Sequence, residues 1–223
     1  MQVSKKALIF GVESFTGKYL QQAFEEIGIE VFGTTLLKNQ KSDCDITKYD
    51  ECSRIMKSIK PDYVVNLSGI SFVPHGDYRQ VYEVNFSGAV NVIKACEEYA
   101  PNSSLLLISS GQTYAALDTP IKESDSLELS NHYSVSKNAM ESVAKLSPLN
   151  VKIARSFNYT GVGQNVKFLI PKIVSHYKQK STNIVLGDVD VFRDFSDVRD
   201  VVKAYVAILL SDSKSKMVNV CSN

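Results

Sequence analysis

The sequence predicts an α/β fold built on a doubly wound parallel sheet. Short, continuous apolar runs alternate along the first 155 residues with longer segments whose apolar residues recur at helical spacing. Continuous apolar strands indicate a parallel sheet covered on both faces, because right-handed crossovers place helices there. The chain has 223 residues, 44% of them hydrophobic, which is enough for one large core without disulfides. We therefore expect one doubly wound domain over residues 1–155 and a smaller part, packed on its edge, over residues 156–223.

The predicted elements follow this pattern in chain order. A first strand spans residues 7–10, and the helix after it carries Leu20, Phe24 and Ile27 on one face and ends at Gly28. Thr47 is expected to cap a helix that ends before Pro61. Further strands are expected at residues 31–32, 63–67, 105–108, 183–186 and 217–221. Further helices are expected at residues 82–99, 131–146, 171–179 and 197–210.

Charge and cysteine usage exclude several classes of protein. The 25 Lys and Arg residues nearly balance the 24 Asp and Glu residues, which argues against a general binder of nucleic-acid backbones. The four cysteines form no CxxC or Cys/His cluster, so neither a disulfide framework nor a metal site is expected. The apolar run at residues 7–12 is too short for a signal-peptide core, and no run approaches a membrane span. We expect a soluble, cytoplasmic protein.

A glycine-bearing loop stands between the first strand and the first helix, with the sequence Gly11-Val12-Glu13-Ser14-Phe15-Thr16-Gly17. At this place a dinucleotide fold binds pyrophosphate, using a tight turn and the free N–H groups of the helix start. Ser14 occupies the position where a glycine usually lets the backbone approach the phosphates. Either its hydroxyl bonds a phosphate or cofactor binding is weakened. A loop that only turns a strand into a helix is the alternative interpretation.

The end of the second strand bears on the choice of cofactor. NAD sites commonly offer an acidic residue to the ribose there, but residues 33–38 contain none. Lys38 could instead meet the 2′-phosphate of NADP, so the sequence favours NADP(H) over NAD(H). Lys38 could equally be a solvated surface lysine.

Tyr133 and Lys137 are the main catalytic candidates. They are four residues apart at the start of a predicted helix and therefore share a face. A nearby ammonium is expected to lower the pKa of the phenol, which lies near 10 when unperturbed. Ser110 ends the preceding buried strand, at the edge where doubly wound sheets bind ligands. The alternative is an ordinary pair on a helix surface.

Several spaced motifs in order carry a resemblance to a known family. They are the glycine loop, Asp45-Ile46, Asn66-Leu67-Ser68-Gly69, Val84-Asn85-Phe86-Ser87-Gly88, Ser109-Ser110 with Tyr114, and Tyr133-Ser-Val-Ser-Lys137. In these motifs the chain resembles the extended short-chain dehydrogenase/reductase family, the NAD-dependent epimerases, dehydratases and reductases of nucleotide sugars. The segments at residues 155–164 and 193–201 resemble the branch that contains GDP-mannose 4,6-dehydratase and GDP-6-deoxy-4-keto-mannose reductase.

The resemblance implies a Rossmann fold, a nucleotide-sugar substrate and roles for particular residues. The implied catalytic residues are Ser110, Tyr133 and Lys137. The implied cofactor-binding residues are Gly11, Ser14, Phe15, Thr16, Gly17, Thr35, Lys38, Asp45, Ile46, Leu67, Ser68, Gly69, Asn85, Tyr133 and Lys137. The implied substrate-binding residues are Ser71, Ser110, Gln112, Asn158 and Arg193. Arg193 could instead form an ion pair with Asp194 or Asp197, and Asn158 could be a turn residue.

One departure from the family's sequence pattern reduces the number of reactions that we expect. A dehydratase needs a carboxylic acid just after the catalytic serine, but Gly111-Gln112-Thr113 follows Ser110, and an amide cannot supply that proton. We therefore expect a reductase of the C4 ketone of a nucleotide-linked 4-keto-6-deoxy sugar. A 4-epimerase, an alcohol-oxidising dehydrogenase and a non-catalytic nucleotide-binding relative remain alternatives. The resemblance further implies a homodimer and, because the relatives continue past the segment that matches residues 218–222, an incomplete substrate-binding part.

Overall fold

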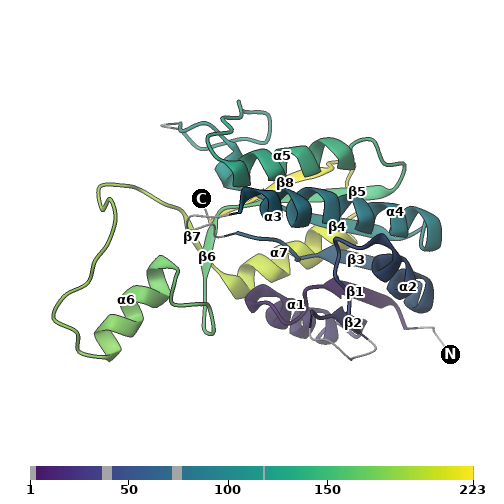
Figure 1. The fold of residues 1–223 in the computed structure, drawn as a ribbon, viewed down its shortest axis with the longest axis horizontal. Coiled ribbons are helices and arrows are strands. Elements are labelled where there is room, and N and C mark those ends of the chain that lie inside the picture. Colours follow the sequence, from purple (N-terminus) through teal and green to yellow (C-terminus); the bar gives the residue numbers. More distant parts are fainter. Residues whose placement is uncertain (1–3, 37–41, 72–76, 118, 223) are drawn as a thin grey trace.

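A six-stranded parallel sheet forms the centre of the molecule (Figure 1). The structure is a computed structural model and describes residues 4–36, 42–71, 77–117 and 119–222. The strands lie in the order β2-β1-β3-β4-β5-β8. Their bounds are β1 (Lys6–Phe10), β2 (Glu30–Thr34), β3 (Tyr63–Asn66), β4 (Ser104–Ser110), β5 (Asn150–Ser156) and β8 (Met217–Val220). The predicted doubly wound α/β fold is confirmed.

Two layers of helices bury the two faces of this sheet. Along β1, Leu8 and Phe10 belong to one core cluster, and Ala7 and Ile9 belong to the other. The first cluster is covered by α2 (Tyr49–Ile59), α4 (Ala89–Tyr99) and α5 (His132–Ala144). The second is covered by α1 (Phe15–Glu25) and α7 (Val198–Leu210). Successive side chains of a strand point to opposite faces, so a strand buried on both sides is apolar at every buried position. Residues 7–10 of β1 show this.

The long helix expected at residues 82–99 has a more complex form. It begins with α3 (Tyr78–Tyr82), continues through a π-helical segment over Glu83–Gly88 and ends with α4. Ile46 lies against Gly88, where a Cβ would come within 2.6 Å of the Ile46 Cδ1 atom. Such π-helical turns often occur at functional sites. This one carries Asn85.

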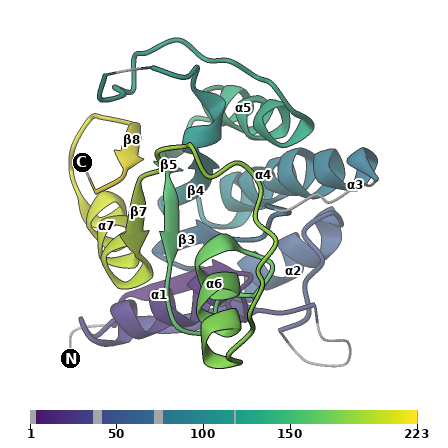
Figure 2. The ribbon, with the colours of Figure 1, turned by 90° about the vertical axis from the view of Figure 1, so that its left-hand side faces the viewer.

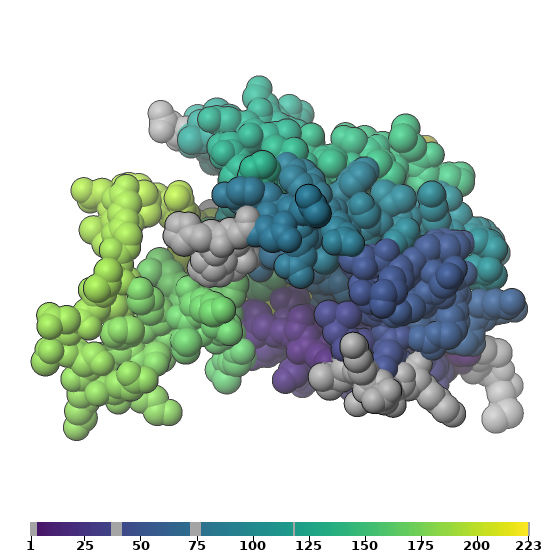
Figure 3. All heavy atoms as spheres, in the orientation of Figure 1, coloured from purple at the N-terminus to yellow at the C-terminus, as the bar shows by residue number. Residues whose placement is uncertain are grey.

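Much of the smaller part joins the main body. Helix α7 packs beside α1, and β8 pairs with β5. The strands β6 (Asn158–Thr160) and β7 (Phe195–Asp197) form a separate two-stranded parallel sheet (Figure 2). Helix α6 (Leu169–Lys178) has no buried residue and, with the chain that follows it, projects from the body (Figures 1 and 3). The division into two domains stays a prediction.

Two local expectations are wrong. Residues 183–186 form no strand, since no segment among the described residues pairs with them. Thr47 does not cap α2; its hydroxyl bonds Asp45, and Lys48 takes the cap position without a side-chain bond. The expected strand lacks a pairing partner, and the expected cap is lost because Asp45 holds the Thr47 hydroxyl.

A buried lysine anchors helix α7 to the sheet. Lys152 lies inside β5, and its ammonium donates to the carbonyl oxygens of Ile208, at 2.7 Å, and Ser211. These carbonyls belong to the end of α7, where backbone acceptors lack helical partners. Burial lowers the pKa of Lys152.

Replacing Lys152 by Met should destabilise the protein by about 1–3 kcal/mol, because the carbonyls at the end of α7 lose a charged donor. Urea unfolding followed by circular dichroism measures the change. The control is Lys214→Met, at an exposed lysine, which should alter the free energy of unfolding by less than about 0.5 kcal/mol. Equal effects of the two substitutions would contradict the anchoring role.

Candidate functional site

The predicted site residues meet where the strand order reverses. From β1 the chain continues to β2 on one side and then returns to β3 on the other, which is the place where doubly wound sheets bind ligands. Gly11 follows β1 with a φ of 81°, a value that suits glycine. A Cβ on Gly11 would lie 3.1 Å from the Ser68 Oγ atom beyond β3, so the two strand ends are closely packed. Ser110 ends β4 at the same edge.

The start of α1 forms an anion-binding cradle. The side chain of Ser14 caps the helix and accepts from the amide of Gly17 at 3.0 Å, and the amide of Lys18 donates to the Ser14 carbonyl oxygen. The amides of Phe15 and Thr16, in the first turn, have no intrahelical acceptor. A Cβ on Gly17 would fall 2.4 Å from the Val12 carbonyl oxygen, so only glycine allows this tight loop. The cradle therefore fits the pyrophosphate of a dinucleotide, with Ser14 acting as a helix cap.

The glycine loop also packs onto the end of β2. Gly11 donates to the Thr34 hydroxyl at 3.3 Å, and Thr35 Oγ1 donates to Glu13 Oε2 at 2.5 Å. Thr35 was expected to contact the cofactor, and it lies beside the cradle. Lys38, the residue expected to meet a 2′-phosphate, lies outside the described residues.

Helix α5 presents the catalytic candidates on one face. It begins with a capping box in which Asn131 and Ser134 exchange hydrogen bonds. The ammonium of Lys137 lies 5.9 Å from the centre of the Tyr133 ring and donates to the Ile108 carbonyl oxygen at 2.8 Å. Ser110, at the end of β4, lies close enough to Tyr133 for its hydroxyl to influence the pKa of the phenol. The structure thus brings the three predicted catalytic residues together.

The protonation of this group differs from the expectation. Burial raises the pKa of Tyr133 to about 12, although the hydrogen bond with Ser110 acts to lower it. Burial likewise lowers the pKa of Lys137 to about 8, while the charge of Glu141 opposes that shift. The expectation that Lys137 would pull the phenol pKa below 10 is wrong for this structure, because loss of water dominates both groups. Tyr133 is therefore neutral and can donate a proton.

The remaining predicted cofactor residues surround this edge in different roles. Asn85 is buried, and its amide bonds both backbone groups of Ile70 and the hydroxyl of Ser136. It thus holds the segment after β3 against α5. Gly69 is exposed in this segment, and a Cβ there would lie 3.4 Å from Lys137 Nζ. The other members lie on the loops after β2 and β3: Asp45, which binds Thr47; Ile46, whose side chain belongs to the core; and the partly exposed Leu67 and Ser68.

The predicted substrate residues lie on the exposed side of the same edge. Gln112 is exposed in the short 3-10 helix after Ser110, and Ser71 is exposed after β3. Asn158 begins β6, in register with Phe195 of β7, and exposed Arg193 precedes β7. The contact that the structure gives for the Arg193 side chain is a bond to the Phe192 carbonyl oxygen, whereas Asp197 pairs with Arg199 and Asp194 binds Ser222.

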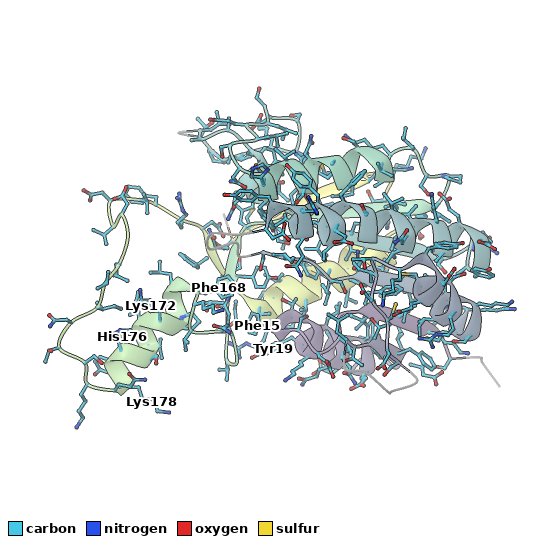
Figure 4. All side chains as sticks on the ribbon, viewed as in Figure 1. Phe15, Tyr19, Phe168, Lys172, His176 and Lys178 are labelled. Carbon is cyan, nitrogen blue, oxygen red and sulfur yellow. The ribbon has the colours of Figure 1, made fainter. Side chains whose placement is uncertain are left out.

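Helix α1 is joined to the segment that contains Asn158 through aromatic contacts. The Phe15 and Tyr159 rings stack at 6.3 Å, and the Tyr159 hydroxyl lies 3.0 Å from Thr16 Oγ1. Phe15 and Tyr19 lie at the end of α1 that faces the projecting part, as Figure 4 shows. The cradle and the predicted substrate segment are therefore held in contact.

Sequence reasoning missed a buried ionic network behind the predicted catalytic residues. Glu141, one helical turn after Lys137, receives two hydrogen bonds from Arg155, at 2.9 and 2.6 Å, and one from Ser109 at 2.5 Å. Glu141 and Arg155 are 1% and 3% exposed. The Arg155 guanidinium also lies 4.6 Å from the centre of the Tyr114 ring. The available signal was the spacing of Glu141 from Lys137, which places both on one face of α5.

Comparisons with known proteins identify similar sequences. The model of the NAD dependent epimerase/dehydratase family matches residues 7–221. The chain is 30% identical over 222 residues to GDP-6-deoxy-D-talose 4-dehydrogenase of Aggregatibacter actinomycetemcomitans, covering 97% of this chain and 74% of the relative. It is 30% identical over 234 residues to GDP-6-deoxy-D-mannose reductase of Pseudomonas aeruginosa, covering 99% and 75%.

A solved structure is similar over the same extent. It is that of RMD from Pseudomonas aeruginosa complexed with NADPH, with a TM-score of 0.85, 29% identity, and coverage of 98% of this chain and 76% of that one.

Two further observations concern metal ligands and membrane-spanning helices. In the part of the chain that the structure describes, no three His, Cys, Asp or Glu side chains are placed to hold a metal ion. None of the helices within those residues is both long and apolar enough to span a bilayer.

Proposed function

The chain belongs to the NAD dependent epimerase/dehydratase family, and we propose that it reduces the C4 ketone of a nucleotide-linked 4-keto-6-deoxy sugar, preferably a GDP sugar, with NAD(P)H. The observation that carries this proposal is the meeting of Ser110, Tyr133 and Lys137 beside the anion-binding cradle of α1. Two relatives at 30% identity, both named as oxidoreductases of GDP-6-deoxy sugars, support the substrate class.

Each residue has a separate task in this reaction. The bound nicotinamide supplies a hydride to the carbonyl carbon. Tyr133, kept neutral by burial, donates its proton to the oxygen that becomes the alcohol. Ser110 hydrogen-bonds that oxygen as negative charge develops on it, and Lys137 binds the nicotinamide ribose and stabilises the phenolate that remains. The amides of Phe15 and Thr16 hold the pyrophosphate.

On the substrate side, Asn158 and Arg193 hold the diphosphate of the sugar nucleotide. The Arg193 guanidinium suits this task because it makes forked, charge-assisted bonds to phosphate oxygens. Both residues belong to the β6 and β7 region, which contacts the cradle through Tyr159 and Phe15. Ser71 and Gln112 line the sugar site from the ends of β3 and β4.

The reverse direction, oxidation of the C4 alcohol, is the second candidate, because one relative is named as a 4-dehydrogenase. The same three residues serve it, with Tyr133 accepting a proton instead. Near neutral pH Tyr133 carries its proton, which is the state that reduction requires, whereas oxidation requires the phenolate. A dehydratase remains disfavoured, because exposed Gln112 is an amide and cannot give up the required proton.

The test is a direct assay with the purified protein. NADH or NADPH is incubated with freshly made GDP-4-keto-6-deoxymannose, the loss of nicotinamide absorbance is followed, and the product is identified by NMR. We expect oxidation of the cofactor and a new C4 alcohol. No absorbance change with any nucleotide-linked 4-keto sugar would contradict the proposal. Oxidation of a GDP-6-deoxy sugar alone would favour the dehydrogenase.

The rate of reduction should fall as the pH rises above about 8, because Lys137 then loses the charge that stabilises the Tyr133 phenolate. Tyr133 keeps its proton over this range, since its pKa is about 12. We expect kcat/KM to fall about tenfold per pH unit above this value. The variant Lys137→Arg, which keeps its charge, should remove the fall. A profile of the unmodified enzyme that stays flat to pH 10 would contradict this assignment.

The homodimer implied by the resemblance stays a prediction. The outer faces of α4 and α5 offer a shallow groove lined by Val90, Val143 and Leu146, and Leu146 is 83% exposed. Val81, Val92 and Ala95, on the α3 and α4 helices, are buried in the core of the subunit itself. A dimer would therefore use the outer groove and leave these three residues in place.

A further inference from the structure

Glu13 brings a negative charge to the end of β2 from a different segment of the chain. It lies inside the glycine loop, with its side chain exposed. Its carboxylate accepts the hydroxyl hydrogen of Thr35 at 2.5 Å. Thr35 is the residue directly after β2 and is buried. The carboxylate therefore lies at the strand end where the acidic residue of an NAD site is normally found.

The position of this loop is fixed by its packing on β2. The amide of Val12 donates to the Thr34 carbonyl oxygen at 3.3 Å, and Gly11 donates to the Thr34 hydroxyl. A Cβ on Gly33 would lie 2.2 Å from Val12 Cγ1, so the loop covers the strand at van der Waals distance. Because the neighbouring backbone is held in this way, Glu13 remains beside Thr35.

The two nicotinamide cofactors differ at the adenosine ribose. NAD carries a 2′-hydroxyl, which can donate a hydrogen bond to a carboxylate, and NADP carries a 2′-phosphate with about 1.5 to 2 negative charges near neutral pH. A carboxylate at this point attracts the 2′-hydroxyl of NAD and repels the 2′-phosphate of NADP. We propose that Glu13 selects NAD(H) over NADP(H), which rests on the proposed nicotinamide-dependent function. It replaces the acidic residue that residues 33–38 lack.

This inference reverses the preference that Lys38 suggested in the sequence. Glu13 therefore predicts a preference for NAD(H), whereas Lys38 predicts a preference for NADP(H). Substitutions at the two positions distinguish these predictions. Glu13→Gln removes the negative charge and keeps the size of the side chain. Lys38→Gln removes the positive charge. Glu30→Gln is the matched control, because Glu30 is an exposed glutamate at the opposite end of β2.

The experiment measures equilibrium binding, independently of turnover. NADH and NADPH are titrated into the intact protein and the three variants, with the fluorescence of the bound nicotinamide as the signal. We expect the unmodified protein to bind NADH at least about tenfold more tightly than NADPH, a difference of about 1.4 kcal/mol. Glu13→Gln should bring the ratio close to one, mainly by tightening NADPH, and Glu30→Gln and Lys38→Gln should leave it above about fivefold. Higher salt should narrow the ratio of the unmodified protein by weakening the repulsion.

The possible failures are distinguishable. Tighter or equal binding of NADPH by the unmodified protein, or a ratio that moves with Lys38→Gln or Glu30→Gln and not with Glu13→Gln, overturns the role of Glu13 and leaves the proposed reaction intact. Failure to bind either dinucleotide overturns the proposed function and this inference with it. Thermal melts of the three variants test whether each substitution leaves the fold unchanged.

Discussion

Replacing Tyr133 by Phe should reduce kcat for the 4-keto sugar by about 10²–10⁴-fold. The substitution removes one hydroxyl from a ring whose surroundings, buried and beside Ser110, otherwise stay the same. Without it no proton reaches the developing alkoxide, while Lys137 and the cradle of α1 are unchanged. Dissociation constants for the nicotinamide cofactor should therefore stay close to those of the unmodified protein. Single-turnover absorbance measurements and fluorescence titrations test the two statements separately.

The matched control for this substitution is Tyr177→Phe. Tyr177 is 87% exposed on the projecting helix α6, so loss of its hydroxyl should leave the rate unchanged. If Tyr133→Phe kept full turnover, another group would have to supply the proton, and the catalytic assignment would be wrong. If it lost cofactor binding as well, Tyr133 would hold the cofactor more strongly than we propose.

Breaking the buried pair of Glu141 and Arg155 should produce the largest loss of stability. Removing either partner leaves the other charge buried and unpaired, which costs about 3–5 kcal/mol. For a protein of this length, 1 kcal/mol corresponds to about 2–4 °C, so Glu141→Gln and Arg155→Met should each lower Tm by about 6–20 °C. Denaturant unfolding at neutral pH measures the free energy directly.

A double substitution distinguishes the coupling between Glu141 and Arg155 from the separate contributions of the two side chains. Glu141→Gln combined with Arg155→Met removes both charges, and we expect it to be more stable than either single variant, because no uncompensated charge remains. The control is Lys203→Met, which removes a distant, exposed ion pair with Asp200 and should cost less than about 1 kcal/mol. If the effects of the two single substitutions simply added in the double variant, the proposed coupling would be contradicted.

The same pair links stability to the active site. Glu141 raises the pKa of Lys137 against the effect of burial. At temperatures where the Glu141→Gln variant remains folded, Lys137 should lose its proton at a lower pH than in the unmodified protein. A purely structural role would leave the pH profile where it was.

The sequence predicts those strands whose burial is visible in their own residues. Strands β1, β3 and β4 are continuous apolar runs, and each was expected within three residues of its observed ends. Strand β5 was missed because Lys152 and Arg155 interrupt its apolar run. Both are buried, and each is neutralised or bonded by groups distant in the chain. The three-residue strands β6 and β7 depend on each other, so neither has a local pattern that could reveal it.

The site residues likewise include some that the sequence spacing predicts and others that only the folded structure brings together. Tyr133, Lys137 and the glycine loop are recognisable because their spacing along the chain is also their arrangement in space. The pairs of Glu13 with Thr35 and of Glu141 with Arg155 join residues 22 and 14 positions apart, and only the packed sheet brings them together. The protonation of Tyr133 was misjudged for a related reason. It depends on how much water the folded chain excludes.

The bond between Tyr114 and Asn219 has a consequence for the order of folding. The Tyr114 hydroxyl donates to Asn219 Oδ1 at 2.7 Å across a separation of 105 residues, and Asn219 belongs to β8, the edge strand beside β5. Closing so long a loop is entropically unfavourable until the sheet is already assembled. The strands from β1 to β5 can therefore collapse around the cradle first, whereas the turn after Ser110 receives this anchor only when β8 adds to the sheet. We expect amide hydrogen exchange to protect β1 and β3 earlier than β8 during refolding, and the loop after β1 to become ordered before the turn after Ser110.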